Sequence, residues 1–312
     1  MPQFEPVVLF FLLGALAGFA RSDLRVPGVL YESLSIFLLL AIGLKGGVEL
    51  ARHPLASVVG PALVVVAAGA LIPLVAYPVL RRVGRLPRAD AGSIAGHYGS
   101  VSVVTFAVGT TYLARLGHEA EGYMTVLLVL LEFPALVIGV LLARRGEAGT
   151  PWRKVLHEVV AGRSIVLLLG GLAIGWLAGP GGIAPLDRLF FDLFKGVLAL
   201  FLLELGLVAA SRFGELRRAG PFLIGFAIGM PLVAAGLGVA TGVAIGLSVA
   251  GVTLLATLYA SASYIAAPAA MRLALPQANP ALSIGAALGI TFPFNLLVGI
   301  PLYHRLAQQA LP

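Results

Sequence analysis

Two apolar stretches, far apart in the chain, each carry a cluster of small and hydroxyl-bearing residues. The first reads GSIAGHYGSVSVVTFAVG over residues 92–109, and the second reads TLLATLYASASYIAAPAA over residues 253–270. Small-residue or Gly/Pro interruptions at matching places in two hydrophobic segments indicate helices that break in mid-membrane. The residues that we expect to line a binding site at these breaks are Gly99, Ser100, Val101, Ser102, Thr105, Ser261, Ala262, Ser263 and Tyr264.

The chemistry that a broken helix offers suits an anion. The N–H groups that open its second segment lack helical partners and lie at the positive end of the helix dipole. Serine hydroxyls add hydrogen-bond donors in little volume. Two breaks that cross are expected to clasp one small anion between residues 100–102 and 261–263. The alternative is structural, because small residues also let membrane helices pack closely.

The ionisable residue best placed for function is Glu132, in the middle of a hydrophobic run and directly before Phe133 and Pro134. A charged side chain at the bilayer centre costs roughly 2.5–3.5 kcal/mol on insertion scales, so its presence favours a function. A carboxylate beside a proline-loosened backbone can bind Na⁺ together with other oxygens. It can equally carry a proton or be a buried structural group. The predicted cation ligands are Ser102, Glu132, Thr291 and Asn295.

Other polar residues in these segments are expected to be structural. Lys45 and Glu49 stand four residues apart, so they can neutralise each other on one helix. His97 lies three residues before Ser100. A lone histidine in a helix is more often a hydrogen-bonded packing residue than a ligand. We therefore do not place His97 in the predicted site.

The elements that position these residues must lie in a membrane. The 312 residues are 59% hydrophobic and 11% charged, and the mean hydropathy is +1.01. Apolar runs of about 18 residues or more recur along the chain, each long enough to cross a bilayer as a helix. The predicted spans lie near residues 6–20, 30–50, 57–80, 90–113, 122–143, 164–179, 187–211, 219–240, 243–273 and 279–304.

The charged residues indicate an orientation rather than a nucleic-acid partner. The formal net charge is +7, but the basic residues collect in short loops between the predicted spans, which argues against binding of nucleic acid. Most of the 21 Lys and Arg residues fall in loops on one side. The positive-inside rule then places both termini outside the cytoplasm. The chain has no cysteine, which excludes disulfides and thiolate metal sites.

An internal repeat divides the chain. IPLV at 72–75 returns as MPLV at 230–233, and YGSVS at 98–102 returns as YASAS at 259–263. Because five spans are an odd number, the second copy is inverted relative to the first. We predict an all-α integral membrane protein of ten transmembrane helices in a 5+5 inverted repeat, with spans 4 and 9 broken and crossing. The predicted divisions are a first five-helix repeat at 1–145, a short cytoplasmic linker at 146–162 and a second five-helix repeat at 163–312.

Several motifs resemble those of the sodium-dependent bicarbonate transporter family, and the resemblance covers nearly the whole chain. The motifs are IGLKGG at 42–47, GSVSVVTF at 99–106, FPALVIGVLLA at 133–143, SRFGELRR at 211–218 and ASASYIAAPAAMRLALPQANPALSIG at 260–285.

The resemblance implies a bacterial inner-membrane Na⁺/HCO₃⁻ symporter, assembled as a trimer, in which spans 3–5 and 8–10 move against spans 1, 2, 6 and 7. It also places the anion site at the serine clusters and a carboxylate at Glu132. Cyanobacterial members have an acidic residue in place of Tyr264 and a small polar run in place of Val103 and Val104, which leaves the anion open. Their cytoplasmic insertion is much longer than residues 144–163, so a PII-like regulator is not predicted.

We therefore predict a secondary transporter that couples Na⁺ to a small monovalent anion by alternating access, with bicarbonate favoured. The alternatives are symport of a small organic carboxylate and Na⁺/H⁺ antiport on the same fold. Enzyme motifs such as HExxH and DDxxD are absent from the sequence, so we predict no enzymatic activity. No cofactor is expected beyond Na⁺ as the coupling ion.

Overall fold

The computed structural model describes residues 6–52, 55–145, 153, 157, 160–218 and 220–311. Within these ranges every regular element is helical, and none is a strand. Part of the predicted linker, residues 146–152, and most of residues 153–159 lie outside the described residues.

The helices of the first part of the chain range from eight to 24 residues in length. They are α1 (Pro6–Phe19), α2 (Gly28–Ala51), α3 (Leu55–Gly69), α4 (Leu71–Pro78), α5 (Arg88–Gly99), α6 (Val103–Arg115), α7 (Met124–Glu132) and α8 (Pro134–Ala143).

The second part of the chain begins with three long helices and ends with shorter ones. They are α10 (Arg163–Ile183), α11 (Phe194–Arg218), α12 (Pro221–Ala244), α13 (Val249–Ala260), α14 (Ala267–Ala274), α15 (Pro280–Ala286), α16 (Phe292–Phe294) and α17 (Ile300–Ala310). Between Pro280 and Ala310 the helix continues through π-helical turns at Ala287–Thr291 and Asn295–Gly299. These turns flank Pro293, whose ring nitrogen has no N–H to donate.

Seven of the described helical segments are long and apolar enough to cross a membrane. They are Gly28–Ala51, Ser57–Val83, Met124–Ala143, Arg163–Leu186, Arg188–Ser211, Pro221–Ala244 and Pro280–Ala310. The other three predicted spans do not form one long helix each. The first, α1, has 14 residues, and the runs near 90–113 and 243–273 are each divided into two shorter helices. The chain is thus an all-α membrane protein with interrupted segments between continuous ones.

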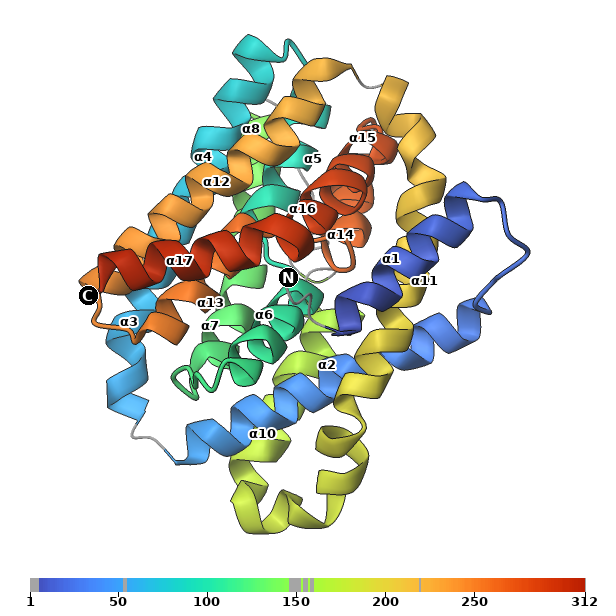
Figure 1. Ribbon diagram of the computed structural model, residues 1–312. Helices are drawn as coiled ribbons and strands as arrows, with labels where there is room; N and C mark the ends of the chain where they lie inside the picture. Colours follow the sequence, from blue (N-terminus) through green and yellow to red (C-terminus); the bar gives the residue numbers. More distant parts are fainter. Residues whose placement is uncertain are drawn as a thin grey trace.

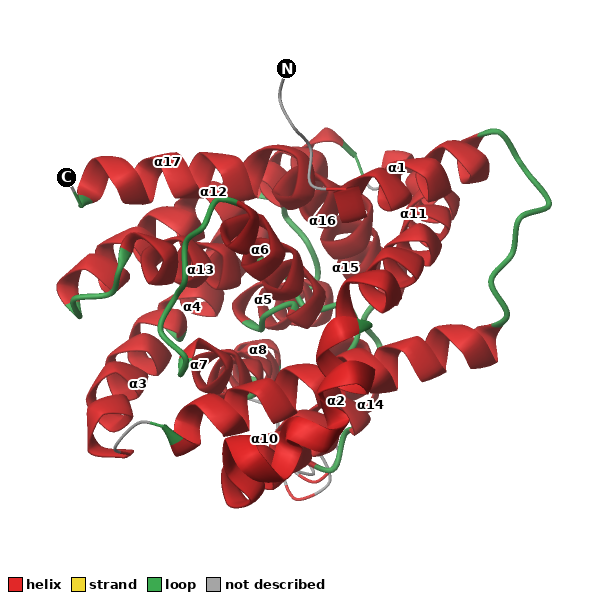
Figure 2. Cartoon of the chain, turned by 60° about the horizontal axis from the view of Figure 1, so that its bottom comes forward, coloured by secondary structure: helices red, strands yellow, loops and turns green. Residues whose placement is uncertain are grey.

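Four helices pack in pairs through glycine. In Figures 1 and 2, α1 and α11 lie side by side, as do α2 and α10, and the four form one side of the molecule. A Cβ added to Gly43 of α2 would lie 2.6 Å from the carbonyl oxygen of Leu168 in α10. A Cβ on Gly171 of α10 would lie 2.9 Å from the carbonyl oxygen of Leu40. Small residues let membrane helices approach closely where lipid provides no hydrophobic driving force.

The remaining helices form the other side of the molecule, with the interrupted helices α5, α6, α13 and α14 within it (Figure 1). The centre of this side holds large buried rings. Tyr98 of α5 packs edge-on against Phe226 of α12 at a centroid distance of 5.0 Å. Tyr259 of α13 donates a hydrogen bond of 2.5 Å to the carbonyl oxygen of Val65 in α3. Helices α5 and α13, in which nearly every residue is buried, are therefore surrounded by protein rather than by lipid.

Candidate functional site

Both serine clusters lie at helix breaks, as the sequence predicts. Helix α5 ends at Gly99, and Ser100 adopts an extended conformation with φ −84° and ψ 162°. Helix α13 ends at Ala260, and Ser261 has nearly the same conformation, with φ −83° and ψ 166°. The chain becomes helical again at α6 and α14. Non-helical backbone at membrane depth is tolerated only when it is buried in protein or lines a cavity.

The two extended segments bond to each other. The backbone N–H of Ser102 donates to Oγ of Ser261 at 2.8 Å, and that hydroxyl donates to the carbonyl oxygen of Leu258 at 2.7 Å. In the other direction, the N–H of Ser263 donates to the carbonyl oxygen of His97 at 2.8 Å. Backbone groups released by the breaks are thus satisfied across the crossing point, where an unpaired buried group would be costly.

Serine hydroxyls also bond to first-turn N–H groups of both second half-helices. Oγ of Ser102 accepts from the N–H of Thr105 at 3.2 Å and from the Thr105 hydroxyl at 2.9 Å. Oγ of Ser263 accepts from the N–H of Ala267 at 3.2 Å. Ser102 is the N-cap of α6, whereas Ser263 lies three residues before Ala266, the N-cap of α14. Each hydroxyl satisfies one N–H group in the first turn of a helix. The positive ends of α6 and α14 therefore both start next to the crossing point.

Glu132 reaches the same region from α7. The helix ends at Glu132 because Pro134, which starts α8, has no N–H to continue the pattern. The Glu132 carbonyl oxygen accepts a hydrogen bond of 3.1 Å from the Ser100 hydroxyl. The Glu132 residue is 1% exposed, and its Oε2 atom has no hydrogen-bond partner among the described residues.

A small cavity joins these groups. Its volume is about 10 Å³, which admits about one water-sized molecule. The residues that line it come from both sides of the molecule: Leu39, Val101, Ser102, Val103, Glu132, Ser164, Ser263, Tyr264 and Ile265.

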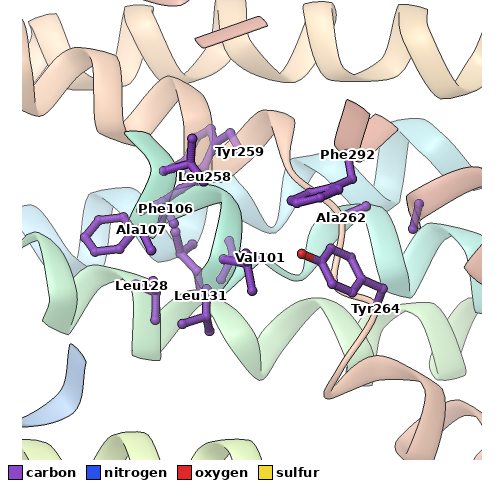
Figure 3. Close-up of a cluster of buried hydrophobic side chains, with 14 of the residues drawn as sticks. Val101, Phe106, Ala107, Leu128, Leu131, Leu258, Tyr259, Ala262, Tyr264 and Phe292 are labelled. Atoms are coloured by element: carbon purple, nitrogen blue, oxygen red, sulfur yellow. The ribbon is translucent and has the colours of Figure 1, made fainter. Parts of the chain in front are cut away.

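Tyr264 contributes the second unpaired oxygen of this cavity. Its hydroxyl has no hydrogen-bond partner among the described residues, and Figure 3 shows it directed toward Val101. The ring is held in place by an edge-on contact with Phe292 at a centroid distance of 5.3 Å. The cavity thus has two unpaired oxygens, and Glu132 is the one charged residue among those lining it.

Two predicted cation ligands form hydrogen bonds with residues outside the cavity. The Thr291 hydroxyl donates to the carbonyl oxygen of Ala227 and accepts from the Tyr98 hydroxyl, both at 2.7 Å. Neither Thr291 nor the other predicted ligand, Asn295, lines the cavity.

Asn295 instead supports the break after α13. Its Nδ2 donates to the carbonyl oxygen of Ala260 at 2.9 Å, and its Oδ1 accepts from the Tyr303 hydroxyl at 2.7 Å. Of the four predicted cation ligands, the structure brings Ser102 and Glu132 to the cavity.

The other predicted site residues are buried at the two breaks. Thr105 and Ala262 are 1% and 3% exposed. A Cβ on Gly99 would lie 2.6 Å from the ring of Pro73, so only glycine fits where α5 ends. Glu49 pairs with Arg52 at 2.8 Å, and the described ion pairs do not include the predicted Lys45–Glu49 pair.

The family model of the Na⁺-dependent bicarbonate transporter superfamily matches residues 6–308. This chain belongs to that superfamily. Membership in the Na⁺-dependent bicarbonate transporter superfamily confirms the resemblance seen in the motifs and makes the chain a multi-pass membrane transporter. The superfamily is one of transporters, not a class of enzymes. A search of curated proteins finds no match to the chain.

In this member of the superfamily, sequence reasoning missed one polar residue that lines the cavity, and His97 forms the hydrogen-bonded packing expected of it. Ser164, near the start of α10, is 5% exposed and lines the cavity. It is an ordinary serine at the start of an apolar run, and no local signal marks it. His97 contacts Ser263 through both its backbone and its side chain. Its position in the GHYGSVS motif is a signal, but the sequence does not say what it contacts.

Proposed function

We propose that this protein is a Na⁺-coupled symporter of a small anion that works by alternating access, with bicarbonate as the favoured cargo. One observation carries the proposal: the start of α6, the segment that leads into α14 and Glu132, which has an unpaired carboxyl oxygen, line one cavity. Helix N-termini attract an anion, whereas a buried carboxylate attracts a cation. These opposite charge preferences suit a cation and an anion carried together, and the cavity of about 10 Å³ must widen before it admits the anion.

The cation half of the site is built on Glu132. Hydroxyl oxygens of Ser102, Ser164, Ser263 and Tyr264 belong to residues lining the same cavity. Oxygen atoms are the ligands that hard cations prefer. Bound Na⁺ neutralises the carboxylate, so that the pair costs less to carry past the centre of the membrane than a bare charge.

Thr291 and Asn295 also belong to the cation set that we propose from the sequence. To bind Na⁺, the side-chain oxygens of both residues must first leave the hydrogen-bond partners that they have in this structure. Thr291 now bonds Ala227 and Tyr98, and Asn295 Oδ1 accepts from Tyr303. Glu132 and Ser102 need no such exchange to reach the cavity.

The anion half of the site is the pair of half-helix starts. Val103, the first residue of α6, lines the cavity, as does Ile265 just before α14. The N–H of Thr105 is held by Oγ of Ser102, and that of Ala267 by Oγ of Ser263. The attraction for an anion therefore comes from the positive ends of the two helix dipoles. The anion binding residues that we propose are Gly99, Ser100, Val101, Ser102 and Thr105 with Ser261, Ala262, Ser263 and Tyr264.

Matched contacts support a 5+5 inverted repeat of ten spans. A Cβ on Gly171 would meet the carbonyl oxygen of Leu40, and a Cβ on Gly14 would meet that of Leu203. Helix α10 thus packs on α2 as α1 packs on α11, which is the relation expected when α1 and α2 of one repeat correspond to α10 and α11 of the other. Exchange of conformations between two such repeats is the usual basis of alternating access.

The cavity lies where the two sides of the molecule meet, since Leu39 of α2 and Ser164 of α10 line it with residues of the interrupted helices. We place the protein in a bacterial inner membrane with both termini outside the cytoplasm, as the distribution of basic residues favours. A trimer is part of the same proposal.

An uptake assay in liposomes tests the proposed function. Purified protein is reconstituted, and ¹⁴C-bicarbonate uptake is measured at clamped pH with and without an inward Na⁺ gradient. We expect uptake that requires the gradient and falls in Ser102→Ala. The control is Thr111→Val, which removes a buried hydroxyl whose one hydrogen bond among the described residues goes to Ala107 of its own helix.

Other outcomes identify the alternative functions. Uptake of a small carboxylate but not of bicarbonate changes the cargo and keeps the mechanism. Proton release on addition of Na⁺, without anion uptake, would establish Na⁺/H⁺ antiport at Glu132.

A further inference from the structure

His97 joins the two interrupted helices by two hydrogen bonds to a single residue. The carbonyl oxygen of His97 accepts from the N–H of Ser263 at 2.8 Å. The Nδ1 atom of the His97 ring lies 2.6 Å from the carbonyl oxygen of the same Ser263. Both backbone groups of Ser263, which the break after α13 leaves without helical partners, are thus held by one residue of α5.

The second contact determines the tautomer of the ring. A carbonyl oxygen only accepts hydrogen bonds, so Nδ1 of His97 must carry the proton. In the neutral ring, Nε2 then has no proton. His97 is 1% exposed, and Nε2 has no partner among the described residues. The ring is therefore a directed donor to Ser263 through one defined nitrogen.

Ser263 in turn positions two parts of the site. Its hydroxyl oxygen accepts from the N–H of Ala267 at the start of α14. The next residue along the chain, Tyr264, presents its unpaired hydroxyl to the cavity. Apart from the bonds with His97 and Ala267, the described hydrogen bonds that other elements make to this segment end earlier, at Ala260 and Ser261. His97 is thus what fixes the backbone directly before Tyr264.

We infer that His97 is a positioning residue, which holds Ser263 and Tyr264 in the geometry that binds the transported ions and couples the segment after α13 to α5. This inference rests on the proposed function for its effect on transport. The structural part of the inference, that His97 restrains residues 261–266, does not depend on the proposed function.

The test uses two substitutions that differ in one hydrogen-bond donor. In His97→Asn, the side-chain nitrogen lies the same number of bonds from the backbone as Nδ1, so the donor is kept. In His97→Leu, an apolar side chain removes it. Thr111→Val again serves as the control for loss of a buried polar group elsewhere in the same region. Size-exclusion chromatography and thermal unfolding verify that each variant is folded.

Two readouts are compared in the full-length protein. Hydrogen–deuterium exchange of residues 261–266 measures the restraint without reference to transport. The anion concentration that gives half-maximal uptake, measured apart from the maximal rate, reports the binding geometry. We expect both to rise about tenfold in His97→Leu, as for loss of one buried hydrogen bond, and to stay near wild type in His97→Asn and Thr111→Val.

Each outcome decides the inference. Unchanged exchange in a folded His97→Leu protein overturns it, and so does equal loss in the Asn and Leu variants. Faster exchange in His97→Leu alone, with no anion taken up even by the wild type, supports the positioning role and rejects the proposed function. If His97→Leu does not fold, ¹⁵N spectra of histidine-labelled wild-type protein show which ring nitrogen of His97 carries the proton. The His97 signals are assigned by their absence from the spectrum of His97→Asn. A proton on Nδ1 supports the inference, and a proton on Nε2 overturns it.

Discussion

The backbone N–H of Ser102 donates a hydrogen bond of 2.8 Å to Oγ of Ser261, and 158 residues of chain separate the two breaks that this bond joins, between positions 103 and 260. The donor belongs to the first interrupted segment and the acceptor to the second. Each break therefore depends on the other for its hydrogen bonding, and neither segment is an independent loop.

Substitution of Ser261 tests this dependence. In Ser261→Ala, the buried N–H of Ser102 loses its acceptor, and we expect the free energy of unfolding to fall by about 1–3 kcal/mol. Thermal unfolding in detergent measures the loss. Ser261→Thr keeps the hydroxyl and is the matched control. Equal stability of Ser261→Ala and wild type would mean that water or another group replaces the lost acceptor.

Glu132→Gln separates the charge of the carboxylate from its shape. A ligand that binds the folded state raises stability with its concentration, by about 2.7 kcal/mol at 100 times its dissociation constant. We expect Na⁺, at constant ionic strength with choline, to raise the unfolding temperature of the wild type but not of Glu132→Gln. Glu49→Gln, which removes a carboxylate paired with Arg52 at the surface, should respond as the wild type does. Retained stabilisation by Na⁺ in Glu132→Gln would place the cation elsewhere.

Tyr264→Phe removes one of the two unpaired oxygens of the cavity and leaves the ring against Phe292. Because that hydroxyl has no partner among the described residues, its loss should not lower the stability of the ligand-free protein. We expect weaker binding of Na⁺ or of the anion, measured as higher half-saturating concentrations in uptake. A clear loss of stability without ligand would show that the hydroxyl is bonded.

Ser164→Val tests whether the free volume of the cavity, at the boundary between the two sides of the molecule, is needed for transport. The added methyl groups should fill a space of about 10 Å³ and reduce uptake strongly, while the helix containing Ser164 stays folded. Ser164→Ala adds no volume and should retain more uptake than Ser164→Val. Equal uptake in the two variants would show that volume at this position is unimportant.

Close packing of α2 on α10 predicts opposite results for two glycines. A Cβ on Gly43 would lie 2.6 Å from the Leu168 carbonyl oxygen, whereas Gly170 has no atom within 4 Å of its added Cβ. Gly43→Ala should lower the free energy of unfolding by about 1–3 kcal/mol through overpacking. Gly170→Ala should be neutral or stabilising by up to about 1 kcal/mol, because alanine favours the helix. The measurement is thermal or denaturant unfolding of the two variants side by side.

Local patterns in the sequence were sufficient for the membrane class, most helix positions and both breaks. Hydropathy depends on each residue alone, and the effects of Gly99 and Pro134 on the backbone extend over only a few residues. For the same reason Glu132 was recognisable as a functional candidate, since a charge within an apolar run is costly wherever the helix points. The family resemblance added the expected cargo.

Only the tertiary structure decided which of these residues meet. It brought Ser164 and Tyr264 to Glu132, and it gave Thr291 and Asn295 other hydrogen-bond partners. It also placed His97 against Ser263. These contacts depend on the rotation of each helix about its axis and on its register against its neighbours. In helices that are apolar on nearly every face, hydropathy does not specify the rotation, so glycine contacts and buried hydrogen bonds between distant segments set it instead.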